Sequence, residues 1–217
     1  DLATGVRAAA WEVPGVTQVV AMPGACAAVT ASADLQFAPT ETQARTVASQ
    51  VLALDATREG ICVATSDDVQ IIKPNGDARK LLSSKPDVRA VTCTPEFVIR
   101  GTTNGLLELH RATEEGTWVR NDTVYESLPT SQVSALAILP GDLLAVGFAS
   151  GELGLWGLGH GRRLASTYVH GPVRHLAVHG TQLHGLSELG DLATLELAAF
   201  SAPYVELLAE MEGVVGE

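Results

Sequence analysis

The stretch VSALAILPGDLLAVGFASGELGLWGLGHGRRLAS, from Val133 to Ser166, decides the fold. It alternates apolar segments rich in Val, Ile and Leu with short turns that contain glycine. The segments have strand length, and their apolar positions are nearly continuous, which is typical of strands covered on both faces. The stretch therefore predicts four short antiparallel strands joined by tight turns, at 133–138, 143–148, 152–157 and 162–168.

Weaker copies of this unit begin at Val16, Val51, Val88 and Val173, so successive starts lie 35, 37, 45 and 40 residues apart. A period near forty residues with four strands per unit is typical of a β-propeller. One unit is too small to bury its own faces, so neighbouring units must pack on one another. We therefore predict an all-β fold, a β-propeller of four-stranded antiparallel blades, with about five blades in this chain.

The remaining strands are predicted from the same alternation of apolar segments and turns. In the second unit, Pro74-Asn75-Gly76-Asp77 supplies a hairpin turn, because Asn-Gly readily adopts positive φ angles. The fifth unit shows three strands instead of four. The predicted ranges are 16–21, 26–31, 34–38 and 44–49; 51–56, 61–65, 68–73 and 78–83; 88–93, 97–101, 106–111 and 117–125; and 173–178, 182–187 and 191–197.

The pattern changes after Leu197. Ser201 can cap a helix whose apolar stripe is formed by Tyr204, Val205, Leu207, Leu208 and Met211, with Gly213 at its end. We therefore predict propeller blades over residues 1–200, and a C-terminal helix near 202–212 with a tail over 201–217. A helix this short needs a surface to dock on, either the propeller or another chain.

The fourth unit resembles the repeats of the WD-repeat β-propeller family, and the best match covers residues 133–166. Trp156 stands at that family's tryptophan position, but Gly157 replaces the aspartate that usually follows. The stretch His170-Gly171-Pro172-Val173 resembles the approach to a first strand in that family. The family's structural set of His, Ser, Trp and Asp is incomplete in every unit, so another seven- or eight-bladed propeller family stays open.

Residues 6–12 resemble an outer fourth strand that lacks the three strands before it. Two interpretations remain open. The segment completes the fifth unit and closes a five-bladed ring, or the chain is the C-terminal part of a larger, seven-bladed propeller whose other blades lie on an absent or separate chain. We favour the second interpretation, because Asp1 follows directly on a position where a repeat would place its tryptophan.

Composition narrows the classes of partner. The chain has 217 residues, of which 46% are hydrophobic and 18% are charged, and its net charge is −11. Nucleic acid and anionic membranes repel such a chain, and no basic cluster counters this repulsion. No segment approaches the length of a membrane-spanning helix. Cys26, Cys62 and Cys93 lie in apolar strands without metal-ligand spacing, which indicates buried thiols in a reducing cytoplasm.

No residue set for catalysis, metal or cofactor binding stands out. Four histidines lie between His170 and His184, but His170 and His179 fall at opposite ends of one predicted strand, about 20 Å apart. Asp67-Asp68 lies in a tight turn and lacks the alternating acids of a calcium loop. Known nucleotide-binding and hydrolase motifs are missing. We predict neither cofactor nor metal, and no enzymatic activity.

The leading functional prediction is a protein-interaction scaffold or sensor module of a larger protein, which could regulate an associated enzymatic domain. The resemblance implies binding of a protein or peptide on the face built by the loops that lead into the first strands. By position, the candidate binding residues are Arg89, Arg174, His170, Asp68 and Asn104. The alternative is a hydrolase or lyase with an active site on the propeller axis, which a central cluster of acids and histidines would favour.

Overall fold

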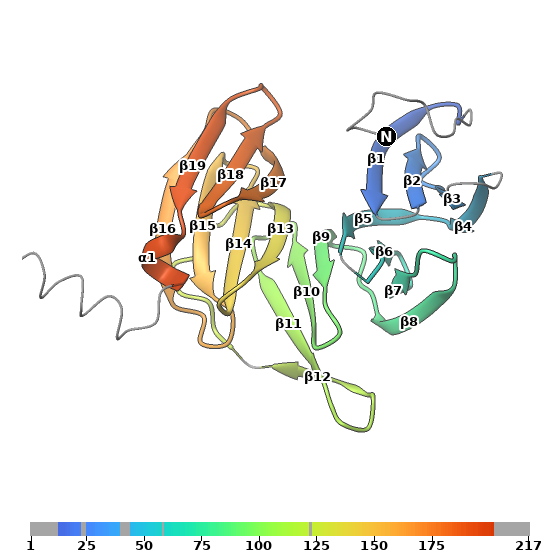
Figure 1. Cartoon of the computed structure of the whole chain (residues 1–217), viewed down its shortest axis with the longest axis horizontal. Coiled ribbons are helices and arrows are strands. Elements are labelled where there is room, and N and C mark those ends of the chain that lie inside the picture. Colours follow the sequence, from blue (N-terminus) through green and yellow to red (C-terminus); the bar gives the residue numbers. More distant parts are fainter. Residues whose placement is uncertain (1–12, 23–24, 40–43, 58, 122, 202–217) are drawn as a thin grey trace, which may run out of the picture. The chain divides into compact units, whose positions relative to one another are not determined.

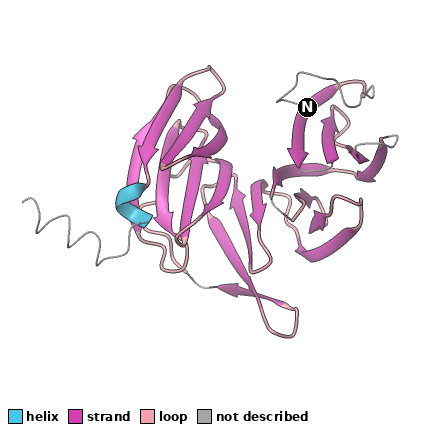
Figure 2. Cartoon of the chain, in the orientation of Figure 1, coloured by secondary structure: helices cyan, strands magenta, loops and turns pink. Residues whose placement is uncertain are grey.

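The structure is a computed structural model and describes residues 13–22, 25–39, 44–57, 59–121 and 123–201. The described residues form nineteen strands, arranged in five antiparallel sheets, and one helical turn (Figures 1 and 2). The chain divides into two compact units, residues 1–122 and 123–217. Within each sheet the strands follow one another in chain order, which confirms the predicted antiparallel blades.

The first unit holds the first three blades. Each blade has four strands, and the predicted ranges agree with the observed ones to within one or two residues, except for the last strand of blade 3. That strand was predicted over 117–125 and is shorter. The strands are β1 (Val16–Met22), β2 (Ala25–Thr30), β3 (Leu35–Pro39) and β4 (Arg45–Ala48); β5 (Val51–Ala56), β6 (Ile61–Thr65), β7 (Asp68–Ile72) and β8 (Ala78–Ser83); and β9 (Val88–Cys93), β10 (Phe97–Thr102), β11 (Leu107–Ala112) and β12 (Trp118–Asn121).

The second unit holds blades 4 and 5. Blade 5 has three strands among the described residues, and a single helical turn follows them. The elements are β13 (Val133–Leu139), β14 (Leu143–Phe148), β15 (Glu152–Gly157) and β16 (Arg163–Tyr168); β17 (Val173–His179), β18 (Gln182–Ser187) and β19 (Leu192–Glu196); and α1 (Ala198–Ser201).

Strand β6 shows how the first unit is held together. Its residues are buried, and successive side chains point to opposite faces of the sheet. Ile61 and Val63 belong to the core between blades 1 and 2, whereas Cys62 and Ala64 belong to the core between blades 2 and 3. Both faces of blade 2 are therefore covered, which explains its nearly continuous apolar sequence.

Blades 4 and 5 of the second unit pack through a core that includes Leu153, Leu155 and Leu183. Glycines let the two sheets approach closely. A Cβ atom added at Gly147 would lie 2.6 Å from Val173 Cγ1, and one added at Gly185 would lie 2.7 Å from Leu153 Cδ2. Larger side chains at these positions would push the two sheets apart, so the glycines are part of the packing.

The predicted turn at Pro74–Asp77 is confirmed. Gly76 has a φ of +85°, a region that glycine reaches without strain. Lys73 N–H donates to the Asp77 carbonyl at 2.9 Å, and Asp77 N–H donates to Asn75 Oδ1 at 3.1 Å. The local sequence therefore fixes the β7–β8 hairpin.

Three further predictions concern particular segments. The strand predicted at 6–12 and the helix predicted at 202–212 lie outside the described residues; the helical turn α1 ends just before the second of these segments. Cys62 and Cys93 are buried and Cys26 is half-buried, and all three thiols are free, as predicted. No helix in the described ranges is long and apolar enough to cross a membrane.

Candidate binding edges of the blades

One backbone hydrogen bond recurs in all five blades. The carbonyl before the first valine of each blade accepts a bond from the N–H that follows the second strand. This bond joins the connection between blades to the turn between the second and third strands, and we call the joined pair the entry edge of the blade. The donors and acceptors are Ala31 to Gly15, Ser66 to Gln50, Thr103 to Asp87, Ala149 to Gln132 and Glu188 to Pro172, at 2.7 to 3.2 Å.

A β-bulge follows the first valine of every blade. The residue after the valine has no partner on the neighbouring strand, so its side chain is re-aimed by the bulge. Two of the five bulge residues are predicted binding residues, Arg89 and Arg174. The complete set, read from the interruptions in strand register, is Thr17, Leu52, Arg89, Ser134 and Arg174.

Three predicted binding residues lie on entry edges of the first unit. Asp68 accepts a 3.1 Å hydrogen bond from Thr65 Oγ1 and lies 3.7 Å from Lys80 Nζ. Arg89 Nη1 donates to the backbone carbonyls of Pro86 and Val88 at 2.9 and 2.7 Å. Asn104 is exposed in the turn between β10 and β11. Among the described residues, no carboxylate forms an ion pair with Arg89.

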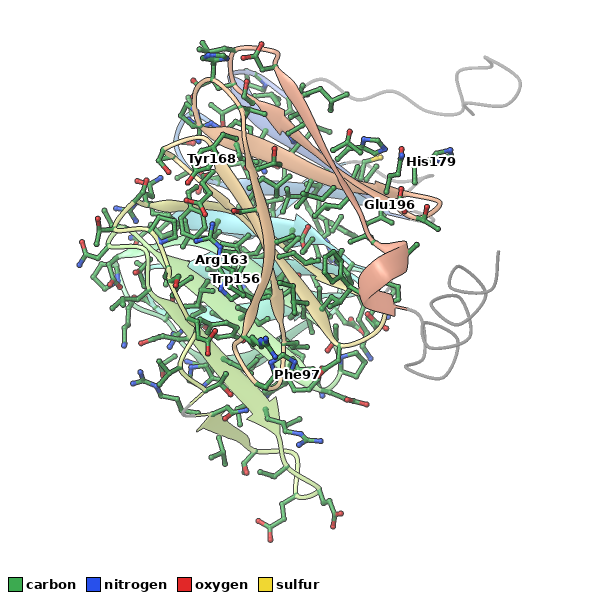
Figure 3. All side chains as sticks on the ribbon, turned by 90° about the vertical axis from the view of Figure 1, so that its left-hand side faces the viewer. Phe97, Trp156, Arg163, Tyr168, His179 and Glu196 are labelled. Carbon is green, nitrogen blue, oxygen red and sulfur yellow. The ribbon has the colours of Figure 1, made fainter. Side chains whose placement is uncertain are left out.

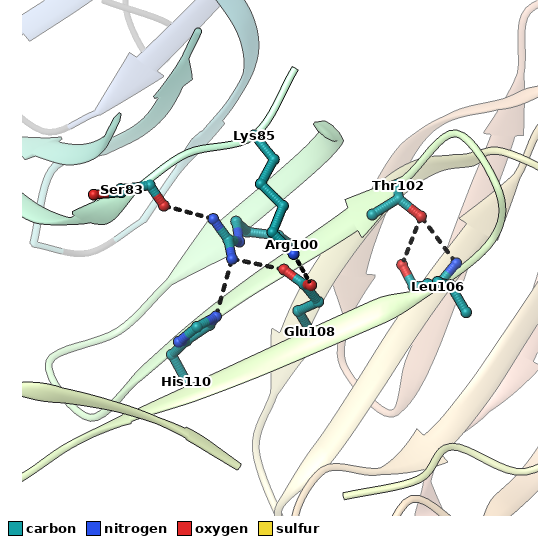
Figure 4. A network of polar contacts seen from close by, with 7 residues as sticks. All are labelled: Ser83, Lys85, Arg100, Thr102, Leu106, Glu108 and His110. Carbon is teal, nitrogen blue, oxygen red and sulfur yellow. Dashed lines mark hydrogen bonds and ion pairs between the residues drawn. The ribbon is translucent and has the colours of Figure 1, made fainter. Parts of the chain in front are cut away.

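A buried ion network joins strands β10 and β11 of blade 3 to the connection that precedes β9 (Figure 4). Arg100 Nη2 donates to Glu108 Oε2 at 2.6 Å, and Nη1 donates to the Ser83 carbonyl at 2.7 Å. Lys85 Nζ binds the other oxygen of Glu108 at 2.5 Å. Desolvation tends to raise the pKa of Glu108, but the hydrogen bond from Lys85 and the charge of Arg100 outweigh it, and the pKa is lowered.

His110 completes this network as a neutral acceptor. Its Nε2 lies 3.1 Å from Arg100 Nη2, and a guanidinium can only donate, so the ring carries its proton on Nδ1. Desolvation and the adjacent Arg100 lower the pKa of His110. The network therefore holds two cations, one carboxylate and a neutral imidazole near neutral pH.

Three buried polar atoms near this ion network lack a hydrogen-bond partner in the described part of the chain. These are Ser84 Oγ, Asp87 Oδ1 and Arg100 Nε. Ser84 and Asp87 belong to the connection between β8 and β9, and Arg100 Nη1 binds the residue before Ser84. Unpaired buried polar groups are costly, so this connection is less optimised for stability than the apolar blade core.

The other two predicted residues lie on the entry edge of blade 5, in the second unit. His170 Nδ1 lies 2.8 Å from Asp191 Oδ2, and Arg174 Nη2 donates to Glu188 Oε2 at 2.8 Å. Both acids come from the turn between β18 and β19. His170 and Arg174 therefore lie together on the entry edge of blade 5, and each has an acidic partner that the sequence did not reveal.

Two leucines on these edges were missed from sequence. Leu106 is 60% exposed on the edge of blade 3 that holds Arg89, and Leu189 is 72% exposed on the edge of blade 5 that holds Arg174. Both lie in the turn after a second strand, but at different positions: Leu189 is the second residue of its turn, like Asn104, and Leu106 is the last, like Asp191. Their exposure could have been predicted from the sequence, because each leucine stands beside a glycine in a polar turn, where burial is not expected.

The described residues contain no group of three or more His, Cys, Asp or Glu side chains that could hold a metal ion. His170 precedes β17 and His179 ends it, as the sequence predicted. Asp55 is a half-buried carboxyl with a raised pKa, and it lies where blades 2 and 3 meet, since Thr92 Oγ1 of blade 3 donates to it at 2.7 Å.

Comparison with known proteins shows the fold. No family model matches the chain, and no curated protein matches it. Among solved structures, the WD40 β-propeller domain of Doa1 is similar with a TM-score of 0.62 and 15% identity, over 86% of this chain and 66% of that one. The computationally designed Ika8 protein has a TM-score of 0.60 and 15% identity, over 83% of this chain and 58% of Ika8. The designed Ika4 protein has a TM-score of 0.53 and 16% identity, over 68% of this chain and 91% of Ika4.

These similarities confirm an all-β, WD40-like propeller fold with five blades among the described residues. The chain spans less than two thirds of the length of Ika8. At 15–16% identity the likeness concerns the fold alone. The predicted seven-bladed ring is not confirmed, and neither is membership of the WD-repeat family.

Proposed function

We propose that this chain is a protein-interaction module that binds a protein or peptide on the entry edges of its blades. Propellers commonly serve as interaction scaffolds, and edge loops are free to vary without disturbing the blade core. The proposed contact residues are Asp68, Arg89 and Asn104 in the first unit, and His170 and Arg174 in the second. The module is a cytoplasmic scaffold or sensor of a larger protein, without cofactor or enzymatic activity of its own.

The observation that carries this proposal is the pairing of an arginine with an exposed leucine on the edge of blade 3. Within the described part of the chain Arg89 makes hydrogen bonds to backbone carbonyls alone, so its charge is available to a carboxylate of a partner. Leu106 on the same edge exposes apolar surface that a partner can cover. The edge therefore fits a peptide that carries an acidic side chain near an apolar one.

Blade 5 also carries an arginine and an exposed leucine on its entry edge, but its arginine is already paired with an acid. Arg174 occupies the bulge position of Arg89, and Leu189 lies in the same turn of the blade as Leu106, but Glu188 already neutralises the arginine. A partner must displace or share this ion pair, so we expect blade 3 to supply the stronger acidic-peptide contact. A partner could also be a separate chain that carries further blades.

Selection of peptides from a random library on the purified chain tests the proposal. We expect enrichment of acidic-apolar peptides whose affinity falls about tenfold or more with Arg89→Glu and with Leu106→Gln, since one charge-assisted bond accounts for about 1.5–3 kcal/mol. Arg79→Glu, at an exposed position on the outer strand β8, is the matched control and should leave affinity within about twofold. Selected peptides that bind the Arg89 and Leu106 variants as well as the parent chain would refute the proposed edge.

A further inference from the structure

Blade 5 has one covered face and one open face. Leu183, Ala193 and Leu195 point toward blade 4 and belong to the core of the second unit. Successive residues alternate between faces, so their neighbours point the other way. Strand register places three cross-strand rows on this open face: His175, Leu186 and Leu192; Ala177, His184 and Thr194; and His179, Gln182 and Glu196.

The open face is exposed, and burial along its middle strand β18 alternates from one residue to the next. Leu186 is 38% exposed and Leu192 is 63% exposed, whereas Leu183 on the covered face is fully buried. Strand β19, the last described strand of the blade, has the sequence LATLE and carries no Lys or Arg.

We propose that residues 202–217 of this chain cover the open face of blade 5. The segment follows α1 directly and has the sequence APYVELLAEMEGVVGE. Its apolar residues Tyr204, Leu207, Leu208 and Met211 recur at helical spacing, which gives one apolar side. A helix of this length is unstable alone, so it needs a docking surface.

The dimensions and the chemistry of the two surfaces agree. From residue 203 to 212 a helix advances about 14 Å, and from Glu196 to Leu192 strand β19 spans about 13 Å. The apolar side of the helix can therefore reach Leu192 and Leu186 from its attachment after Ser201. Figure 3 shows His179 and Glu196 at the end of the blade that lies near α1.

The polar groups of the two surfaces fit the same occupant. Residues 202–217 contain four glutamates and no basic residue. The open face carries His175, His179 and His184, whose ring N–H groups can donate hydrogen bonds to carboxylates. The other charged groups around these histidines are Glu196 on the face itself, and the ion pairs Arg174–Glu188 and His170–Asp191 at its edge; His184 Nδ1 also lies 3.0 Å from Thr194 Oγ1.

A labelled peptide of residues 202–217 tests this proposal with two forms of the protein, the full chain and a chain that ends at Ser201. We expect the shortened chain to bind the peptide at least about tenfold more tightly than the full chain, because the tethered segment competes at a high effective concentration. Leu186→Gln with Leu192→Gln should weaken binding to the shortened chain about tenfold. Val124→Gln, at an exposed valine in the connection before β13, outside both the open face and the entry edges, is the matched control and should have no effect.

A second measurement compares the full chain with the shortened chain and needs no substituted variant. The imidazole NMR signals of His175 and His184 should shift when the full chain is shortened, whereas that of His160, exposed in the turn between β15 and β16, should not. Equal peptide binding by both forms, or absence of binding with unchanged histidine signals, would overturn the proposal. Dimers of equal stability from both forms, measured by light scattering, would also overturn it, because a second copy would then cover the face.

Discussion

The indole Nε1 of Trp156 donates a 2.8 Å hydrogen bond to the backbone carbonyl of Glu126. Trp156 is fully buried on β15, while Glu126 belongs to the connection that precedes β13. Tyr125 adds a second bond from the same connection, from its hydroxyl to the Leu158 carbonyl at 3.0 Å. The tryptophan that marks the repeat in the sequence therefore binds the connection before β13 to blade 4, and Trp156 and Leu155 are both fully buried within the blade packing.

Replacement of Trp156 should destabilise the second unit strongly. The ring contacts Phe148 edge to face and lies under the Arg163 guanidinium, 5.5 Å from its centre (Figure 3). We expect Trp156→Ala to lower the free energy of unfolding by about 3–5 kcal/mol, and Trp156→Phe by less, because it keeps an aromatic ring. Urea unfolding measures both changes, and an unchanged midpoint for the alanine variant would contradict the packing role.

The carboxyl of Asp55 should reduce stability near neutral pH. Desolvation raises its pKa to about 6, and the hydrogen bond from Thr92 compensates only in part. The folded state therefore favours the protonated acid: the cost is absent below the usual pKa of about 3.8, develops between about pH 4 and 6, and is complete above about pH 6. We expect Asp55→Asn, which can still accept the Thr92 bond, to raise the free energy of unfolding by about 2–3 kcal/mol at pH 8.

The pH dependence separates this effect from a general improvement in packing. At pH 4 the asparagine variant and the parent chain should unfold at nearly the same urea concentration. Glu114→Gln, in the exposed turn between β11 and β12, serves as the control and should change neither value. A stabilisation of equal size at pH 4 and pH 8 would show that desolvation of the carboxylate is not its cause.

Tight binding of nucleic acid is not expected. The chain has 14 Lys and Arg against 25 Asp and Glu, and Arg100 forms a buried ion pair, so it cannot contact a phosphate. The negative net charge of the chain therefore repels a phosphate backbone, and its sequence has no basic stripe to attract one. Fluorescence anisotropy with duplex and single-stranded oligonucleotides should show no submicromolar, salt-sensitive binding. Such binding would mean that the few exposed cations form a local footprint despite the net charge.

The strand order was predictable because each blade repeats a valine start, apolar strands and glycine turns. The placement of Arg89 and Arg174 on entry edges followed from the same repeat, since both come directly after the first valine. The pairing of Arg100 with Glu108 was also accessible in principle, because the two residues face each other in the β10–β11 hairpin and lie symmetrically about its turn.

Contacts between blades could not be predicted in this way. The Thr92–Asp55 bond joins residues 37 positions apart, and it depends on how blades 2 and 3 are rotated against each other. That rotation is set by side-chain packing, which no local pattern encodes. The acidic partners of His170 and Arg174 were missed for a related reason, because the pairing depends on where long side chains lie in a turn.

The buried ion network of blade 3 gives the last prediction. Glu108 is the only carboxylate paired with Arg100 and Lys85 within the described part of the chain. Glu108→Gln should therefore leave the buried guanidinium uncompensated and lower the free energy of unfolding by about 3 kcal/mol at pH 7. Glu96→Gln, at an exposed position next to β10 in the same blade, should change it by less than about 0.5 kcal/mol.

If the cost comes from the unpaired charge, the double variant Arg100→Met with Glu108→Leu should be more stable than Glu108→Gln alone, because it removes the buried charges together. Urea unfolding of the three variants decides this, and a double variant less stable than Glu108→Gln would show that the network stabilises blade 3 through its hydrogen bonds to Ser83 and His110 rather than through charge compensation.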